Sequence, residues 1–172
     1  VKFPIKGRKK ESLMVWTTTP WTLTSNIAVA IGPKIIYSKV KHRGETLYIA
    51  KAMLTILKGE YEIVSELSGN DLIGIEYLGP FDEFPVQNDI LHKVIPWDDV
   101  EEYEGTGMVH IAPGAGKEDF LLGKKFNLPK IAPLDESGDF VDGFDWLTGR
   151  NVAETDEAIF DSLRNKDILY HV

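Results

Sequence analysis

The chain has 172 residues, of which 43% are hydrophobic and 27% are charged, and its net charge is −8. This length is typical of one domain with a single sizeable core, so residues 1–172 are expected to form one domain. The absence of cysteine excludes disulfide frameworks and thiolate zinc sites and favours a reducing compartment, so a cytoplasmic protein is expected. No apolar run is long enough to cross a bilayer, and no membrane partner is expected.

The acidic balance limits nucleic-acid binding by this chain. A domain that holds nucleic acid by its own field normally has a basic patch or a high pI, whereas the pI here is about 5.0. The one contiguous basic cluster, Lys6–Lys10, is typical of a solvated loop. Any RNA contact is therefore expected to be local or supported by a larger protein. The start at Val1 and the strand-like end suggest that residues 1–12 and 168–172 are junctions to that protein.

Short β-type runs dominate the first half of the chain. They are separated by turn signals such as HRGE, which is typical of a hairpin. Strands are predicted at residues 13–18, 27–31, 35–42, 46–50, 61–67, 94–100 and 105–113. A short helix is predicted over residues 50–58.

The pattern becomes more helical after residue 116. Asn151 followed by Glu154 resembles a capping box, and apolar residues then repeat at helical spacing up to Leu163. This helix is expected to lead into a last strand at residues 168–172. The sequence therefore predicts a β-rich α/β (α+β) fold with a β-barrel-like core of mostly antiparallel strands and peripheral helices.

The four histidines give little support for a metal site, because none forms an HxH or HExxH pair. His110 differs from the others, since it lies in the stretch GTGMVHIAPGAGKEDF. On local sequence alone, a hydrogen-bonded core histidine is the favoured interpretation. Asp119 lies in the first turn of the helix that follows, where a carboxylate is favourable in any case, so a functional role stays open. The stretch lacks a GxxxxGK[ST] motif, so nucleoside triphosphate binding is not expected there.

A second unusual stretch is WTTTPWTLTSN, Trp16–Asn26, which crowds hydroxyl groups before an apolar strand. On an extended strand Thr17 and Thr19 point to one side and Thr18 to the other. Pro20 then ends the ladder. Taken alone, this stretch favours a β-rich strand with a threonine and proline turn.

The two stretches together resemble the editing domain, or connective peptide 1, of isoleucyl-tRNA synthetases, and the resemblance extends to GFDWLTGRNV near the end. Valine and leucine relatives usually carry T-T-R-P, and valine relatives tend to have lysine at His110. Both differences favour the isoleucine branch. Two departures are Thr24, where the family commonly has proline, and Ala115. No HIGH or KMSKS motif occurs, so the aminoacylation site, with its ATP and magnesium, is expected outside this chain.

The resemblance implies a class I synthetase editing-domain fold and hydrolysis of mischarged valyl-tRNA(Ile), with valyl-adenylate as a second candidate substrate. It assigns Asp119 to the substrate α-ammonium group and His110 to the wall that excludes isoleucine, a steric role that is favoured over proton transfer. The remaining substrate-binding residues are Thr17, Thr18, Thr19, Trp21, Thr22 and Asn26. The catalytic set is Asp119, His110 and Thr18. No covalent intermediate, metal or cofactor is expected for editing.

Three alternatives stay open. In the first, the chain is a module that binds the tRNA acceptor end and catalyses no reaction. In the second, it is the matching domain of a valyl- or leucyl-tRNA synthetase. In the third, it is a metal hydrolase. The expected partners are the 3′ end of tRNA(Ile) carrying a wrong amino acid and the rest of the parent synthetase. A monomer is expected.

Overall fold

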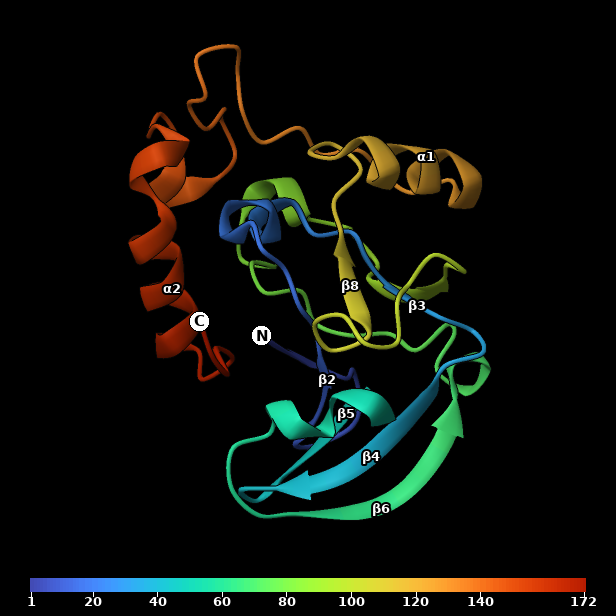
Figure 1. The fold of residues 1–172 in the computed structure, drawn as a ribbon. Helices are drawn as coiled ribbons and strands as arrows, with labels where there is room; N and C mark the ends of the chain where they lie inside the picture. The colour runs from blue at the N-terminus through green and yellow to red at the C-terminus, as the bar shows by residue number, and fades with distance from the viewer. The chain divides into compact units, whose positions relative to one another are not determined.

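The computed structural model describes all residues from 1 to 172, and they form two compact units (Figure 1). Unit 1 comprises Val1–Thr17, Ala28–Leu78 and His92–His110. Unit 2 comprises Thr18–Ile27, Gly79–Leu91 and Ile111–Val172. Each unit is therefore assembled from three separate segments of the chain.

A five-stranded sheet forms much of unit 1 and has the strand order β1-β2-β5-β4-β6. Its strands are β1 (Lys2–Pro4), β2 (Glu11–Met14), β4 (Ile36–His42), β5 (Glu45–Ala50) and β6 (Tyr61–Ser68). The pair β2–β5 is parallel and the other three pairs are antiparallel. The predicted hairpin between β4 and β5 is confirmed, and its turn residues Arg43 and Gly44 both have positive φ angles, of 49° and 80°.

A second sheet has three strands in the order β7-β3-β8. These are β3 (Ala28–Ile31), β7 (Lys93–Pro96) and β8 (Met108–Ile111). All four residues of β3 are buried, which explains its unbroken apolar sequence. Its pairing with β7 is parallel. Strand β8 carries His110 and ends one residue later, at the first residue of a unit 2 segment.

Tyr37 fixes the start of β8 inside unit 1. Its buried hydroxyl accepts from the Gly32 N–H at 3.1 Å and donates to the Gly107 carbonyl at 2.6 Å. Burial raises the pKa of Tyr37 to about 12, so the hydroxyl stays protonated at neutral pH. Gly107 has a φ of 69°, and a Cβ there would lie 2.4 Å from the Ala50 Cβ. The close approach to β5 therefore requires glycine at this position.

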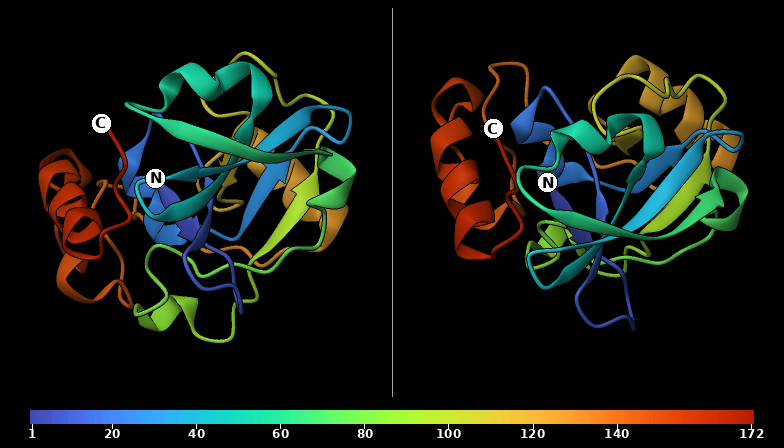
Figure 2. Two further views of the ribbon diagram at one scale, coloured as in Figure 1. Left: turned by 90° about the horizontal axis from the view of Figure 1, so that it is seen from below. Right: turned by 60° about the horizontal axis from the view of Figure 1, so that its bottom comes forward.

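Unit 2 is built mainly from helices around a cluster of aromatic rings. The Phe84 ring lies 5.1 Å from Phe81 and 6.1 Å from Phe144, measured between centroids. Its helices are η1 (Pro20–Ser25), η4 (Pro85–Gln87), α1 (Lys117–Phe126), η5 (Asp145–Leu147), η6 (Val152–Glu154) and α2 (Asp156–Asn165), and unit 1 adds η2 (Lys51–Ile56) and η3 (Gly69–Asp71). Both views in Figure 2 show α2, in red, beside the blue η1, and α2 buries Ile159 and Leu163.

The predicted β-rich α/β fold with peripheral helices is confirmed, with its strands in two separate sheets rather than a closed barrel. The helix predicted over residues 50–58 is the 3₁₀ helix η2. The last predicted strand is wrong, because residues 168–172 form no strand. The Ile168 and Leu169 N–H groups both bond to the Leu163 carbonyl, which turns the chain back onto the end of α2. Asn151 caps η6 rather than α2, by accepting from the Ala153 N–H.

Candidate functional site

The eight candidate residues fall into two groups, one in each unit. Thr17 and His110 belong to unit 1. The larger group, in unit 2, consists of Thr18, Thr19, Trp21, Thr22, Asn26 and Asp119.

The unit 1 group is held together by a short parallel pairing. Trp16 forms an isolated bridge with Val109, and its N–H donates to the Met108 carbonyl at 3.1 Å. Thr17 and His110 are the next residues on these two strands. Position 105 requires glycine, since its φ is 54° and a Cβ there would lie 2.4 Å from Cδ2 of Trp16.

His110 is 6% exposed, and burial lowers the pKa of its imidazole to about 3. The ring is therefore neutral at physiological pH, because its charged form would have to leave water. A group with so low a pKa is a weak general base near neutral pH.

In unit 2 we call Thr18–Ile27 the threonine segment, and its central part forms the 3₁₀ helix η1, which Pro20 begins. Three hydroxyls donate to the carbonyls three residues before them. These bonds are Thr22 to Thr19 at 2.7 Å, Thr24 to Trp21 at 2.7 Å and Ser25 to Thr22 at 3.1 Å. Much of the hydroxyl crowding is thus used to hold a tight turn.

The three consecutive threonines differ in exposure. Thr18 is exposed, whereas Thr17 and Thr19 are half-buried. The Thr18 and Thr19 hydroxyl oxygens lie 3.4 Å apart. Trp21 is half-buried, and Asn26 is fully buried and supports the segment from within. Thr18 is therefore the hydroxyl of this run that unit 2 leaves most open to solvent.

Two hydrogen bonds connect the threonine segment and Asp119 to the backbone at the end of β8. The Ile27 N–H donates to the Ile111 carbonyl at 2.9 Å. The next residue, Ala112, donates its N–H to Oδ2 of Asp119 at 2.7 Å. Unit 2 therefore attaches the end of the hydroxyl-rich turn and the carboxylate to neighbouring residues, 111 and 112.

Asp119 lies half-buried in the first turn of α1, as predicted. Burial raises the pKa of its carboxyl group, the Ala112 N–H opposes that rise, and the nearby Glu118 charge adds to it. Gly114, before the helix, serves packing, since a Cβ there would lie 1.8 Å from the Ile131 carbonyl oxygen. The glycine-rich turn thus brings two backbone segments together.

Gln87 supports the threonine segment and was missed by the sequence interpretation. Its side chain is 5% exposed, and its Nε2 donates to the Thr24 carbonyl at 2.9 Å. Its Oε1 is buried without a hydrogen-bond partner. No motif around residue 87 indicates this role, because the contact joins positions far apart in the sequence.

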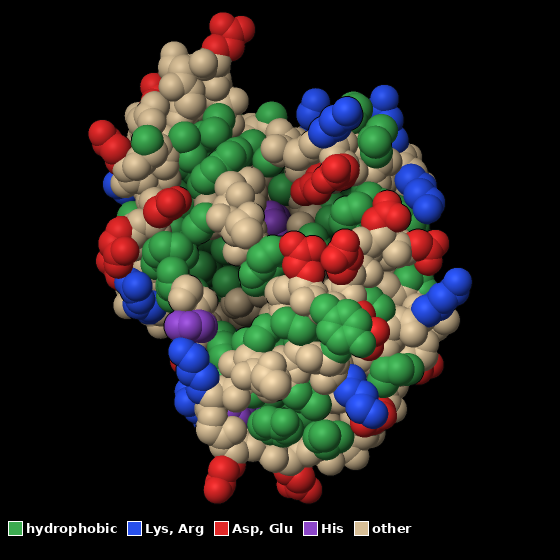
Figure 3. Space-filling model, viewed as in Figure 1, with side chains coloured by type: hydrophobic (Ala, Val, Ile, Leu, Met, Phe, Trp, Pro, Cys, Tyr) green, Lys and Arg blue, Asp and Glu red, His purple; other side chains and the backbone are tan.

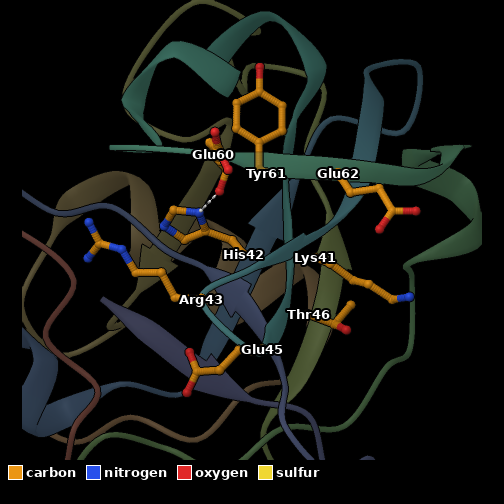
Figure 4. Close-up of a pocket in the computed structure, with 9 residues that line it drawn as sticks. Lys41, His42, Arg43, Glu45, Thr46, Glu60, Tyr61 and Glu62 are labelled. Carbon is orange, nitrogen blue, oxygen red and sulfur yellow. Dashed lines mark hydrogen bonds between the residues drawn. The ribbon is translucent and has the colours of Figure 1, made fainter.

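A hollow of about 500 Å³ lies elsewhere in unit 1, at the β4–β5 hairpin (Figure 4). His42 lies in its wall, with Nδ1 3.0 Å from the Glu60 carbonyl oxygen. The hollow is lined by lysine, arginine and glutamate residues, and it contains none of the candidate residues. No group of three or more His, Cys, Asp or Glu residues is arranged to hold a metal ion. None of the helices has the length and apolar character needed to cross a membrane.

No protein-family model matches the chain. The isoleucine–tRNA ligase of Clostridium acetobutylicum is 43% identical over 170 residues, which is 99% of this chain. The chain belongs to the isoleucine–tRNA ligase family. It spans 16% of the length of that relative.

Solved structures show which fold this isoleucine–tRNA ligase segment has. The crystal structure of GlLeuRS-CP1 covers 94% of the chain with a TM-score of 0.77 and spans 84% of its own length. The P. knowlesi cytosolic leucyl-tRNA synthetase editing domain covers 97% of the chain with a TM-score of 0.65, over 92% of its own length. Their identities of 16% and 9% show the fold alone. The predicted resemblance and the synthetase editing-domain fold are confirmed.

Thr24, one of the two departures noted in the isoleucine–tRNA ligase pattern, has a local explanation. Its hydroxyl donates to the Trp21 carbonyl, and its own carbonyl accepts from Gln87. A proline at this position would lack the first of these bonds. Ala115 donates its N–H to the Ala112 carbonyl at 2.9 Å, which closes the turn before α1.

Proposed function

We propose that this chain hydrolyses the ester of valyl-tRNA(Ile) and releases valine and free tRNA(Ile). A site that selects isoleucine cannot strongly reject valine, since one missing methylene is worth only about 1–3 kcal/mol, a magnitude known from enzymes of this very family rather than obtained from this structure. A second, hydrolytic site that admits valine removes the error. Valyl-adenylate is a second candidate substrate.

The observation that carries the proposal is the anchored carboxylate of Asp119. Its Oδ2 accepts from the Ala112 N–H, next to the residue that holds the end of the threonine segment. A carboxylate is the natural partner of the α-ammonium group that every aminoacyl ester carries. A charge-assisted bond of this kind is worth about 1.5–3 kcal/mol.

Hydroxyl groups suit the other end of the substrate. We assign the exposed Thr18 and the half-buried Thr19 to the terminal ribose and adenine, whose polar atoms need short donors and acceptors. The half-buried Trp21 is assigned to packing against the nucleoside. Thr22 and Asn26 support this segment, because the Thr22 hydroxyl donates to Thr19 and Asn26 is fully buried.

The proposed reaction needs only a positioned water molecule. The water oxygen forms a bond to the ester carbonyl carbon, the bond from that carbon to the ribose oxygen breaks, and the ribose oxygen leaves with a proton supplied by the water. The neighbouring ribose hydroxyl already activates the ester, so correct placement contributes most of the acceleration. The reaction uses no cofactor, and ATP and magnesium are assigned to the aminoacylation site outside this chain.

The role proposed for His110 is to exclude the isoleucyl ester by its bulk. Support comes from its neutral state, since an imidazole with a pKa of about 3 is a weak base at neutral pH. Thr17 directly follows Trp16, which pairs with Val109, the residue before His110. We therefore assign Thr17 to substrate binding together with His110.

Asp119→Asn tests the proposal most sharply at one residue. Asparagine keeps an oxygen for the Ala112 N–H and removes the charge that would bind the ammonium group. We expect kcat/KM for hydrolysis of valyl-tRNA(Ile) to fall about 10- to 100-fold, in line with a loss of about 1.5–3 kcal/mol. Glu118→Gln, at the exposed neighbouring position, is the matched control and should retain the parent rate.

An Asp119→Asn variant that hydrolyses the ester at the parent rate would overturn the ammonium assignment. A parent chain that binds valyl-tRNA(Ile) and does not hydrolyse it would instead support the passive binding module.

A further inference from the structure

Three lysines gather on and after α1 and form what we call the lysine cluster: Lys124, Lys125 and Lys130. All three are exposed, and Figure 3 shows blue side chains collected over the α1 region of unit 2. The sequence pattern does not reveal the cluster, because Lys130 lies outside the helix. The contiguous basic stretch Lys6–Lys10 is therefore not the only place where positive charge accumulates.

The charge of the lysine cluster is not neutralised by carboxylates. None of its members forms an ion pair, although Asp and Glu outnumber Lys and Arg by 27 to 19 in this chain. Within Lys6–Lys10, in contrast, Lys6 pairs with Glu76 and Arg8 with Glu11. The lysine cluster is thus a basic surface whose members are all without a carboxylate partner, whereas two of the four cations in Lys6–Lys10 are paired.

A small hollow lies among these residues. It measures about 180 Å³, and its lining includes Pro113, Phe120, Leu128, Lys124 and Lys130. Ligand pockets for drug-sized molecules usually measure about 300–1,000 Å³. This hollow is smaller than that range, so it suits a single phosphate group with part of its sugar better than a whole nucleotide.

The arrangement around Phe120 decides which part of a nucleic acid fits. The Lys124 and Lys130 ammonium groups lie over this one ring, 4.6 Å and 5.1 Å from its centroid. A nucleobase stacks on an exposed aromatic face, but here the ring is covered by cations. Two like charges that share one ring repel each other, and an anion bound beside them relieves that repulsion. The chemistry therefore favours a phosphate over a base.

A helix dipole alone does not account for the cluster. Lys124 and Lys125 lie in the last turn of α1, where cations offset a charge of about −0.5. Lys130 lies beyond the helix, and its ammonium group nevertheless lies over the Phe120 ring, as that of Lys124 does. The cluster carries more positive charge than the helix end requires.

We propose that the lysine cluster binds a backbone phosphate of single-stranded RNA. That the RNA is the 3′ tail of a tRNA rests on the proposed function, since Asp119 lies on the same helix, five residues before Lys124. Five residues correspond to about 7.5 Å along a helix axis. Because the ester is on the terminal nucleoside, any backbone phosphate of the tail lies upstream of it, and α1 carries both Asp119 and two of the three lysines.

The test measures binding of a synthetic RNA hairpin with an unpaired 3′ tail ending in CCA and carrying no amino acid. The variant is Lys124→Gln/Lys130→Gln. Its control is Lys9→Gln/Lys10→Gln, which removes the same two positive charges from an exposed turn of unit 1. Binding is measured by fluorescence anisotropy across a series of salt concentrations.

We expect the slope of log affinity against log salt to become shallower by about 0.7 in the lysine-cluster variant, the value for one phosphate of a single strand. This slope corresponds to about a fivefold loss of affinity at roughly 0.1 M salt. The charge-reversed Lys124→Glu/Lys130→Glu should lose more. The control should keep the parent slope.

Equal affinities and slopes for the lysine-cluster variant and its control would overturn this inference, and so would a parent chain that binds no RNA. The readout contains no hydrolysis step. A chain that binds the hairpin through Lys124 and Lys130 but does not cleave valyl-tRNA(Ile) would therefore contradict the proposed function and leave the phosphate contact standing.

Discussion

His110 and Asp119 show how one physical effect acts in opposite directions on two residues. Burial disfavours the charged form of each, so it lowers the pKa of the imidazole and raises that of the carboxyl group. His110 is thereby kept neutral, which makes it a weak base and agrees with the steric role that we propose. Asp119 keeps a backbone N–H on Oδ2 that opposes the effect of burial and favours its ionised form.

The lowered pKa of His110 makes stability depend on pH. Between its ordinary value of 6.5 and the folded value of about 3, the unfolded chain binds a proton that the folded chain does not. The stabilisation is therefore fully present above pH 6.5 and is lost as the pH falls towards 3. Between pH 7 and 5 this one group removes about 2 kcal/mol from the free energy of unfolding.

The check is chemical denaturation of the parent and His110→Gln at both pH values. The variant should lose about 2 kcal/mol less between pH 7 and 5 than the parent does. Identical losses in the two proteins would show that His110 is not held neutral by the fold.

His110 also tests selectivity. His110→Ala should increase hydrolysis of isoleucyl-tRNA(Ile) about tenfold or more, because removing a steric barrier against one methylene changes the free energy by about 1–3 kcal/mol. Steady-state deacylation of isoleucyl- and valyl-tRNA(Ile) measures both rates. A variant that loses valyl hydrolysis and gains no isoleucyl hydrolysis would point to proton transfer instead.

Among the elements, η1 depends on support from η4. Gln87→Leu removes the donor to the buried Thr24 carbonyl, and an unsatisfied buried carbonyl costs about 1–3 kcal/mol. We expect the free energy of unfolding to fall by that amount and deacylation to slow, because η1 begins directly after the substrate-binding candidates Thr18 and Thr19. Thr24→Val, which removes one hydroxyl bond and keeps the shape, should cost about 0.5–1.5 kcal/mol.

Urea denaturation and single-turnover deacylation check both variants. A Gln87→Leu protein with unchanged stability and rate would show that η1 does not depend on this contact. A loss of stability with an unchanged rate would limit Gln87 to a structural role.

Local patterns predicted the elements that depend on nearest neighbours. The β-type runs of β4 and β5, the HRGE turn and the position of Asp119 in the first turn of α1 are read directly from the sequence. The error at residues 168–172 has a different cause. Those residues are apolar enough for a strand, yet their N–H groups bond to the Leu163 carbonyl rather than to a strand.

The candidate site was predictable only in part for the same reason. The two motifs identify Thr18 and Asp119 as candidates, but no local pattern links Gln87 to Thr24 or Lys130 to Phe120. Such contacts arise from packing between distant segments. Sequence spacing also cannot distinguish hydroxyls that hold η1 from those left exposed, which the structure does for Thr22 and Thr18.

The net charge of −8 on the whole molecule repels the phosphates of RNA and so opposes RNA binding. The RNA recognition that we propose therefore depends on local features, namely the lysine cluster and the threonine segment. We expect affinity for the RNA hairpin to fall with rising salt, with a slope that corresponds to only one or two phosphates. A slope that corresponds to many phosphates would show a broad basic surface that this chain does not present.

We propose above all that the chain hydrolyses the ester of valyl-tRNA(Ile), which carries the wrong amino acid for this tRNA. The most direct measurement is single-turnover deacylation of valyl-tRNA(Ile) and isoleucyl-tRNA(Ile) by the purified chain at saturating protein concentration. We expect the valyl ester to be cleaved well above its spontaneous rate and the isoleucyl ester at least tenfold more slowly, in line with discrimination worth about 1–3 kcal/mol. Equal cleavage of the two esters, or no cleavage of either by a chain shown to bind the RNA, would contradict it.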